Sequence, residues 1–150
     1  IKINYKNMAE TLGSLCDKLT IVKLKQFHSK DKPRLKSLKE QETRLQNEIN
    51  EFTNKAAHRL IPLESLSFKA NKVFKKDGNK IEKIKCNIGQ VFAALAETNC
   101  DLWHVQEKIY EFEKVPARQK DQTIKQLALL NLKRNECIDE IDQTFIKMLK

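Results

Sequence analysis

One short segment of the sequence combines residue types that can bind a metal ion. In Asp101-Leu102-Trp103-His104, a carboxylate and an imidazole stand three residues apart. This is the spacing that carboxylate-bridged metal centres use in helical bundles. Such centres need a second acid–histidine pair and two more carboxylates, and the comparable segment Lys25-Gln26-Phe27-His28 contains no acid. The sequence therefore predicts neither a metal site nor any other cofactor.

Polar residues that interrupt apolar helix faces are a second source of chemistry. They are Glu42, Thr98, Asn131 and Arg134. An arginine in such a face needs an acidic partner because an unpaired buried charge is very costly, and Glu42 is the expected partner of Arg134. The pattern favours a buried polar layer that sets the register of packed helices.

The alternative is that these residues form a cavity for an anionic ligand. The candidate ligand-binding residues are Glu42, Trp103, His104, Asn131, Arg134 and Asn135. Loss of binding in a folded Arg134→Ala variant distinguishes this cavity from a purely structural layer. The sequence contains no nucleophile elbow, phosphate loop or HExxH motif, so we assign no catalytic residue and do not favour an enzyme.

Lysines gather in the middle of the chain. The net charge at pH 7 is +9, and much of the excess falls in residues 59–85. The expected basic surface comprises Lys69, Lys72, Lys75, Lys76, Lys80, Lys83 and Lys85. The pattern favours a solvated loop, with an anionic membrane surface or a phosphorylated sugar carrier as alternative partners. Nucleic acid is not expected, because recognised RNA- and DNA-binding motifs are missing.

The four cysteines show no pattern of metal ligands or redox pairs. Cys16, Cys86, Cys100 and Cys137 contain no CxxC pair and no histidine at zinc-finger spacing. Three of them fall on or beside apolar helix faces. We therefore expect reduced structural thiols in a reducing cytosol.

Apolar residues recur at steps of three and four along four stretches, which predicts four helices to carry these side chains. Asn7 and Glu10 indicate a capping box at the start of the first helix, which runs to about residue 28. Asp31 and Pro33 indicate the start of the second, which reaches residue 58. The third begins near residue 81, and Asp121 opens the fourth.

The connector between the second and third helices lacks this periodicity. We expect its apolar residues to hold it across the bundle, in part through a short helix. These residues are Leu60, Ile61, Leu63, Leu66, Phe68, Val73 and Phe74.

The elements predict one all-α domain over residues 1–150. It is an antiparallel four-helix bundle made of two similar helical hairpins, 7–58 and 81–149, joined by a long basic crossover connector, 59–80. The halves match at a constant offset, which indicates a duplication. The matched positions are Leu12, Leu15, Leu19 and Phe27-His28 with Ile88, Val91, Leu95 and Trp103-His104. No apolar stretch approaches the ~20 residues of a membrane span.

Several short segments resemble a known family. They are Leu102-Trp103-His104, Leu130-Asn131, Arg134-Asn135 and Ile138-Asp139-Glu140-Ile141-Asp142, together with Leu15-Cys16-Asp17-Lys18-Leu19-Thr20-Ile21-Val22 and Phe27-His28. They resemble an uncharacterised all-helical bacterial domain of unknown function, whose genes lie beside glycosyltransferase genes of lipopolysaccharide and other surface-glycan clusters. That family usually has Trp where this chain has Phe27. The resemblance implies a non-catalytic accessory role in glycan assembly.

The expected function follows from this resemblance. It is that of a helical accessory protein of bacterial surface-polysaccharide or lipopolysaccharide biosynthesis, cytoplasmic or peripheral to the membrane, with protein partners. The alternative is a helical adaptor subunit in a larger complex such as a secretion or effector assembly. A nucleic-acid-binding bundle is the weakest of the three hypotheses.

Overall fold

The computed structural model describes residues 8–68, 84 and 87–150. The described residues form the helices α1 (Leu12–His28), α2 (Lys32–Ala57), α3 (Ile88–Tyr110) and α4 (Ala117–Leu149). Two short 3-10 turns, η2 (Leu63–Ser65) and η3 (Phe112–Lys114), follow α2 and α3. No strand occurs in these ranges, so the all-α class is confirmed there. Within the same ranges, no helix has both the length and the apolar character to cross a membrane.

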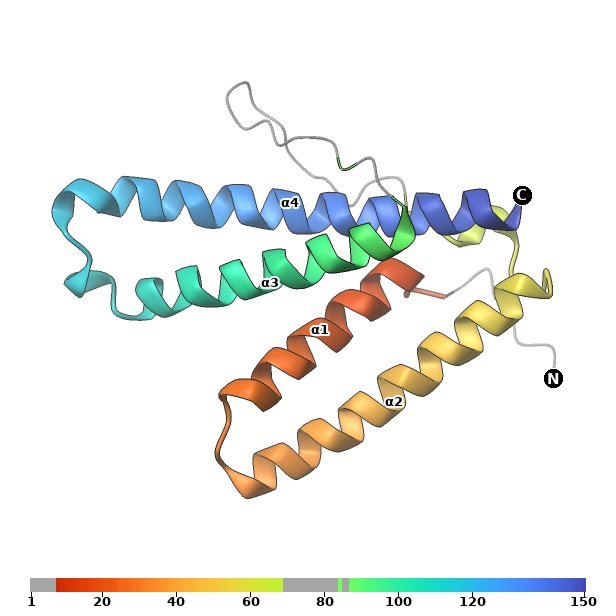
Figure 1. Cartoon of the computed structure of the whole chain (residues 1–150), viewed down its shortest axis with the longest axis horizontal. Helices are drawn as coiled ribbons and strands as arrows, with labels where there is room; N and C mark the ends of the chain where they lie inside the picture. Colours follow the sequence, from red (N-terminus) through yellow and green to blue (C-terminus); the bar gives the residue numbers. More distant parts are fainter. Residues whose placement is uncertain (1–7, 69–83, 85–86) are drawn as a thin grey trace.

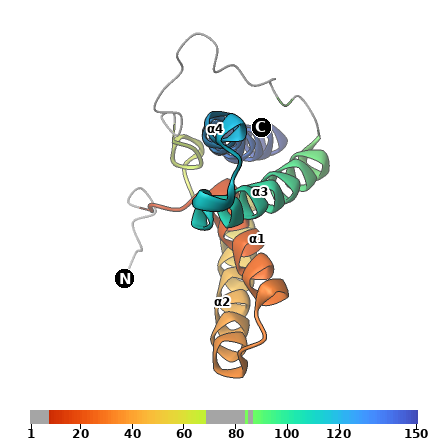
Figure 2. The same cartoon turned by 90° about the vertical axis from the view of Figure 1, so that its left-hand side faces the viewer.

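The helices are arranged as two pairs that meet at one end. Helix α1 lies beside α2, and α3 lies beside α4 (Figure 1). Figure 2 looks nearly along α4 and shows the α1–α2 pair extending away from the other pair. Helix α1 contacts both α3 and α4. The two pairs are therefore joined mainly through α1, and the turn between α1 and α2 points away from α4.

Helix α1 begins at a different place from the one the sequence predicted. Thr11 and Ser14 form the capping box: the Ser14 N–H donates to Thr11 Oγ1 at 3.2 Å, and the Thr11 N–H donates to Ser14 Oγ at 2.8 Å. Glu10 instead accepts a hydrogen bond from Ser14 Oγ at 2.6 Å and pairs with Lys18. The predicted start at Asn7, which lies outside the described residues, is therefore wrong. The capping box that forms is that of Thr11 and Ser14, next to Leu12, the first buried leucine.

Helix α2 begins as predicted. The Asp31 carboxylate accepts a hydrogen bond from the Arg34 N–H at 3.0 Å, and Pro33 lies in the first turn. This arrangement satisfies one backbone donor that a helix start leaves free. At the other end, Arg59 adopts a left-handed backbone with φ of 58°. The chain turns out of α2 at this residue.

The starts of α3 and α4 differ from prediction in opposite directions. Helix α3 begins at Ile88, not near residue 81, because Asn87 and Gln90 form a capping box there. Helix α4 begins at Ala117, immediately after Pro116, four residues before the expected start at Asp121. Pro116 is the N-cap residue of this helix, with φ of −54° and ψ of 137°, and its ring fixes φ only.

The first part of the connector is fastened to the core, as expected. Ile61 and Leu66 are each 1% exposed, and Leu63 in η2 packs against them. Leu60 and Phe68, which were also expected to be anchors, are 57% and 46% exposed. They fall on the solvent side of a segment that buries only one face. The remaining expected anchors, Val73 and Phe74, lie outside the described residues.

The main core lies where the two helix pairs meet. It is formed by Leu12, Leu15, Phe52, Ala56, Ile61, Leu66, Val91, Leu95, Cys137, Ile138, Ile141 and Phe145. Every α-helix contributes to this cluster. Two residues of the predicted apolar faces, Ile124 and Met148, are instead 51% and 64% exposed. Their neighbours Thr123 and Leu149 are buried and partly buried, so the two exposed residues lie on another side of α4.

The closest approach in this core joins the start of α1 to α4. The Gly13 N–H donates to Asp142 Oδ1 at 2.7 Å, across 129 residues of sequence. A Cβ atom on Gly13 would lie 2.4 Å from the Ile138 carbonyl oxygen. Burial raises the pKa of Asp142 to about 7, although the Gly13 hydrogen bond works in the opposite direction. The helices meet here without room for a side chain on α1.

Candidate functional site

Glu42 is buried, as predicted, but its partners are not those expected. Its carboxylate accepts hydrogen bonds from Gln26 at 2.9 Å, Lys39 at 3.1 Å and Lys23 at 3.2 Å. The predicted pairing with Arg134 is therefore wrong. Glu42 faces α1 within the first helix pair, and lysines on both helices are closer. These three hydrogen bonds, led by that from Gln26, lower the pKa of Glu42 to about 2.

This network predicts a specific acid dependence of stability. Because the folded pKa of about 2 lies below the ordinary value of 4.5, the ionised Glu42 stabilises the fold above pH 4.5. That contribution is lost as the pH falls towards 2. We expect Glu42→Gln to lower the melting temperature by a few degrees at pH 7, and the difference from the natural protein to shrink by pH 3. Thermal unfolding followed by circular dichroism at both pH values measures it.

Glu40→Gln is the matched control, because Glu40 is an exposed glutamate on the same helix. It should leave the melting temperature unchanged at both pH values. An effect of Glu42→Gln that is equally large at pH 3 and pH 7 would contradict the network.

The remaining candidate ligand residues are not gathered around the hollow that Trp103 lines. The hollow that Trp103 lines is completed by residues of α1 and α2, not by Asn131, Arg134 or Asn135. Asn131 Nδ2 donates to the Leu127 carbonyl oxygen of its own helix at 3.1 Å. Arg134 Nε is buried without a hydrogen-bond partner among the described residues. A ligand role for these three residues stays a prediction.

A polar contact between α1 and α3 was not predicted. Asn99 is 3% exposed, and its Nδ2 donates to Asp17 Oδ1 at 2.9 Å and to Thr20 Oγ1 at 2.6 Å. Its neighbour Thr98 is fully buried, as expected, and donates to the Ala94 carbonyl oxygen at 2.7 Å. Asn99 lies next to the apolar face of α3. At such a position the spacing of apolar residues does not predict whether a side chain is buried or exposed.

Trp103 and His104 lie close to the end of α1. The ring of Trp103 stacks on that of His28, with centroids 4.7 Å apart and an interplanar angle of 7°. Trp103 Nε1 donates to Glu107 Oε1 at 2.8 Å, and His104 Nδ1 lies 3.8 Å from Glu107 Oε2. The stack fixes the orientation of the Trp103 ring. This contact joins residues far apart in the chain, so no local sequence pattern predicts it.

A hollow of about 380 Å³ lies beside this stacked pair. We call it the tip groove, and it is lined by Lys25, His28, Ser29, Arg34, Ser37, Leu38, Gln41 and Trp103. None of the described residues that line it carries a carboxylate. Lys25 of α1 and Arg34 of α2 bring two positive charges to its lining. The planar guanidinium of arginine matches the geometry of phosphate. The arrangement suits an anionic ligand.

Only some of the polar groups around the tip groove form hydrogen bonds with other described residues. The nearby Asp31 carboxylate accepts from the backbone N–H of Arg34 and caps α2. Ser29 Oγ is buried without a hydrogen-bond partner among the described residues. A buried hydroxyl in this state is usually satisfied by water or by a ligand. Of the residues that line the tip groove, the sequence identified only Trp103 as a candidate ligand residue. Lys25 and Arg34 were not identified, because isolated basic residues on a helix surface are common.

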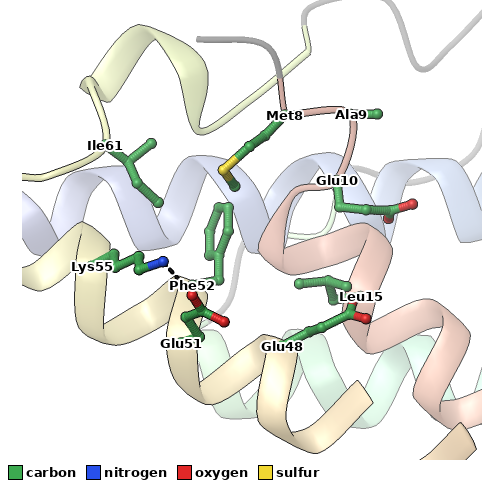
Figure 3. Close-up of a pocket in the computed structure, with 9 residues that line it drawn as sticks. All are labelled: Met8, Ala9, Glu10, Leu15, Glu48, Glu51, Phe52, Lys55 and Ile61. Carbon is green, nitrogen blue, oxygen red and sulfur yellow. Dashed lines mark hydrogen bonds and ion pairs between the residues drawn. The ribbon is translucent and has the colours of Figure 1, made fainter. Parts of the chain in front are cut away.

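A second hollow, of about 310 Å³, lies at the other end of the α1–α2 pair (Figure 3). Its walls are largely apolar: Figure 3 shows Met8 and Ile61 reaching towards Phe52. Two acidic side chains at its rim are already paired, Glu51 with Lys55 and Glu10 with Lys18. Glu48 is the third acidic residue of the lining, and Lys55, its one basic residue, is paired with Glu51. This hollow therefore does not suit an anionic ligand.

The remaining predictions concern the basic surface, the cysteines and metal binding. The basic surface, Lys69, Lys72, Lys75, Lys76, Lys80, Lys83 and Lys85, lies outside the described residues, as does Cys86. Cys16, Cys100 and Cys137 are free thiols. Burial raises the pKa of Cys16 to about 12, which keeps it protonated. In the part of the chain that is described, no cluster of three or more histidine, cysteine or acidic residues could hold a metal ion.

Comparison of the chain with protein-family models, with curated proteins and with solved structures finds no match.

Proposed function

We propose that this chain is a non-catalytic helical accessory protein of bacterial surface-polysaccharide or lipopolysaccharide biosynthesis, which binds a phosphorylated ligand in the tip groove. The observation that carries the proposal is the groove itself. Lys25 and Arg34 stand beside the stacked His28–Trp103 pair, with no carboxylate among the described lining residues. The resemblance of the sequence to a family encoded beside glycosyltransferases supports the pathway. The proposed location is the cytoplasm or the cytoplasmic membrane surface.

Phosphate is the anion that this site suits best. Charge-assisted hydrogen bonds from a guanidinium are stronger than neutral ones, and they can be bidentate. The Trp103 ring offers a flat apolar wall of the kind on which a sugar or another ring can rest. A phosphorylated sugar carrier combines these two features.

Arg34→Ala tests the proposal directly. Trp103 is the only tryptophan in the chain, so its fluorescence reports on the tip groove. We expect pyrophosphate and a sugar 1-phosphate to change this fluorescence saturably, and Arg34→Ala to raise the Kd at least about tenfold, the equivalent of one lost charge-assisted hydrogen bond. Isothermal titration calorimetry measures the same Kd independently.

Arg118→Ala is the control, because Arg118 is an exposed arginine in the first turn of α4 and does not line the groove. It should bind like the natural protein. Binding that neither substitution changes, or no saturable binding at all, refutes an anion site at this place.

The alternative function, a helical adaptor, is favoured by the exposed aromatic residues. Phe27 is 83% exposed and Tyr110 is 79% exposed, at the ends of α1 and α3. Exposed large aromatic side chains are typical anchors of protein interfaces. Affinity purification from the native host separates the two functions: enzymes of glycan assembly are expected partners of an accessory protein, and secretion or effector components are expected partners of an adaptor.

The finer architecture is also proposed: two antiparallel hairpins, related by duplication, within one bundle. Three features of the structure support it. Helices α1 and α3 both begin with a capping box at matching positions, Thr11–Ser14 and Asn87–Gln90. Each has a glycine at the second helical position. The matching residues His28 and His104 also lie near one another, with ring centroids 6.5 Å apart.

A further inference from the structure

The tip groove does not end at Lys25. A second hollow, of about 340 Å³, follows it along the surface between α1 and α2, and Lys25 and Gln41 line both hollows. We call this second part the flank groove. Because they share these two lining residues, the two hollows adjoin one another. We refer to them together as the channel, which extends from the stacked His28–Trp103 pair towards Lys18 and Glu48.

The two parts of the channel differ in chemistry. The flank groove has a largely apolar wall, formed by Ile21, Val22 and Leu45. Besides the shared Lys25, its basic residues each have an acidic neighbour: Lys18 is paired with Glu10, and Arg44 lies one helical turn from Glu48. The tip groove carries positive charge without a lining carboxylate in the described residues. The channel is therefore cationic at one end and apolar at the other.

The arrangement of the helices explains why this apolar wall is open. The α1–α2 turn extends away from α4, and no third described helix covers the outer side of the pair there (Figure 2). Two helices alone leave a shallow furrow between them. In a closed bundle, another helix would fill such a furrow.

We propose that the ligand of this channel is a single amphiphile, with a phosphate head in the tip groove and an apolar chain in the flank groove. The proposal rests on the proposed function and adds the class of the ligand. Burial of the chain against Ile21 and Leu45 adds binding free energy in proportion to its length. The ten residue steps from Lys18 to His28 correspond to a helix length of about 15 Å, which limits the length of apolar chain that can be covered.

A chain-length series tests this proposal. The probes are inorganic phosphate, butyl phosphate and octyl phosphate, each below its aggregation concentration, with octanol as the probe that lacks the head. We expect the affinity to rise about twofold or more for each added methylene, because each buried methylene contributes favourably. Octanol should bind far more weakly than octyl phosphate. Trp103 fluorescence and calorimetry report the binding.

Ile21→Gln separates the two ends of the channel. It should leave the affinity for inorganic phosphate unchanged and remove most of the gain from the octyl chain. Ile124→Gln is the control, because Ile124 is a 51% exposed isoleucine on α4 that does not line the channel. The Ile124→Gln variant should retain the whole gain in affinity from the octyl chain.

The possible failures are distinguishable. Binding of phosphate with no dependence on chain length overturns the amphiphile and leaves the proposed anion site intact. No binding of any phosphate probe overturns both. Equal binding of octanol and octyl phosphate refutes the placement of the phosphate head in the tip groove. Adsorption to vesicles of anionic lipid that Ile21→Gln does not change, without binding of monomeric octyl phosphate, indicates a membrane surface and also overturns the proposal.

Discussion

Replacing Gly13 with alanine is expected to lower the free energy of unfolding by about 2–4 kcal/mol, because it overpacks a tight helix crossing. The added Cβ would lie 2.4 Å from the Ile138 carbonyl oxygen and 3.0 Å from Asp142 Oδ1. The nearer atom belongs to the backbone of α4 and cannot rotate away. Helices α1 and α4 must therefore move apart, which also lengthens the hydrogen bond between the Gly13 N–H and Asp142. Urea unfolding followed by circular dichroism measures the change.

Gly89→Ala is the matched control, because Gly89 occupies the same second position in α3 that Gly13 occupies in α1. The nearest atom to a Cβ at Gly89 is Asn87 Oδ1, at 3.7 Å, an ordinary contact. Alanine is the better helix former, so this variant should be as stable as the natural protein or more stable by up to about 1 kcal/mol. An equal loss of stability in both variants would show that the crossing is not the cause.

The second large effect is expected at Asp142. Its carboxyl group is fully buried, and Oδ2 has no hydrogen-bond partner among the described residues. Burial raises its pKa from 3.8 to about 7. Because the unfolded chain releases this proton near pH 4 and the folded chain holds it until about pH 7, the protein should lose stability as the pH rises through this window. Above pH 7 the loss is complete and constant.

Asp142→Asn removes this titration and keeps an oxygen that can accept from the Gly13 N–H. We expect the stability of the variant, relative to the natural protein, to increase by roughly 3 kcal/mol between pH 4 and pH 7.5. Urea unfolding at intervals of half a pH unit follows the difference. Asp101→Asn, at an exposed carboxylate of α3, should show no such trend. A difference that stays constant with pH, or that shrinks as the pH rises, contradicts a buried protonated Asp142.

The helices were predictable because their signals lie within a few residues of each other. Four apolar stripes and the Asp31 cap were enough to predict four helices and the start of α2. The errors lie at helix ends where two signals compete. Near the start of α1, the sequence indicated Asn7–Glu10 as the cap. The helix instead begins with the Thr11–Ser14 capping box, directly before Leu12, which is buried in the core.

The candidate site was predictable only in part. Glu42 and Thr98 were identified as buried polar residues because they interrupt apolar faces, and both are buried. The partners of Glu42 were not identifiable. A stripe shows that a residue faces another helix, but it does not show which one. Lys25 and Arg34 carried no signal, because their value as a site depends on the nearby Trp103 of α3.

Gly13 and Gly89 show what the sequence alone predicts and what it does not. The sequence by itself determined that both lie within an amphipathic helix, because helix formation depends on contacts between residues about four positions apart. Only the tertiary structure decided that α4 crosses α1 at Gly13 and leaves Gly89 open. The same holds for the tip groove, which exists because the end of α1 meets Trp103. Such contacts join residues far apart in the chain, and no local pattern specifies them.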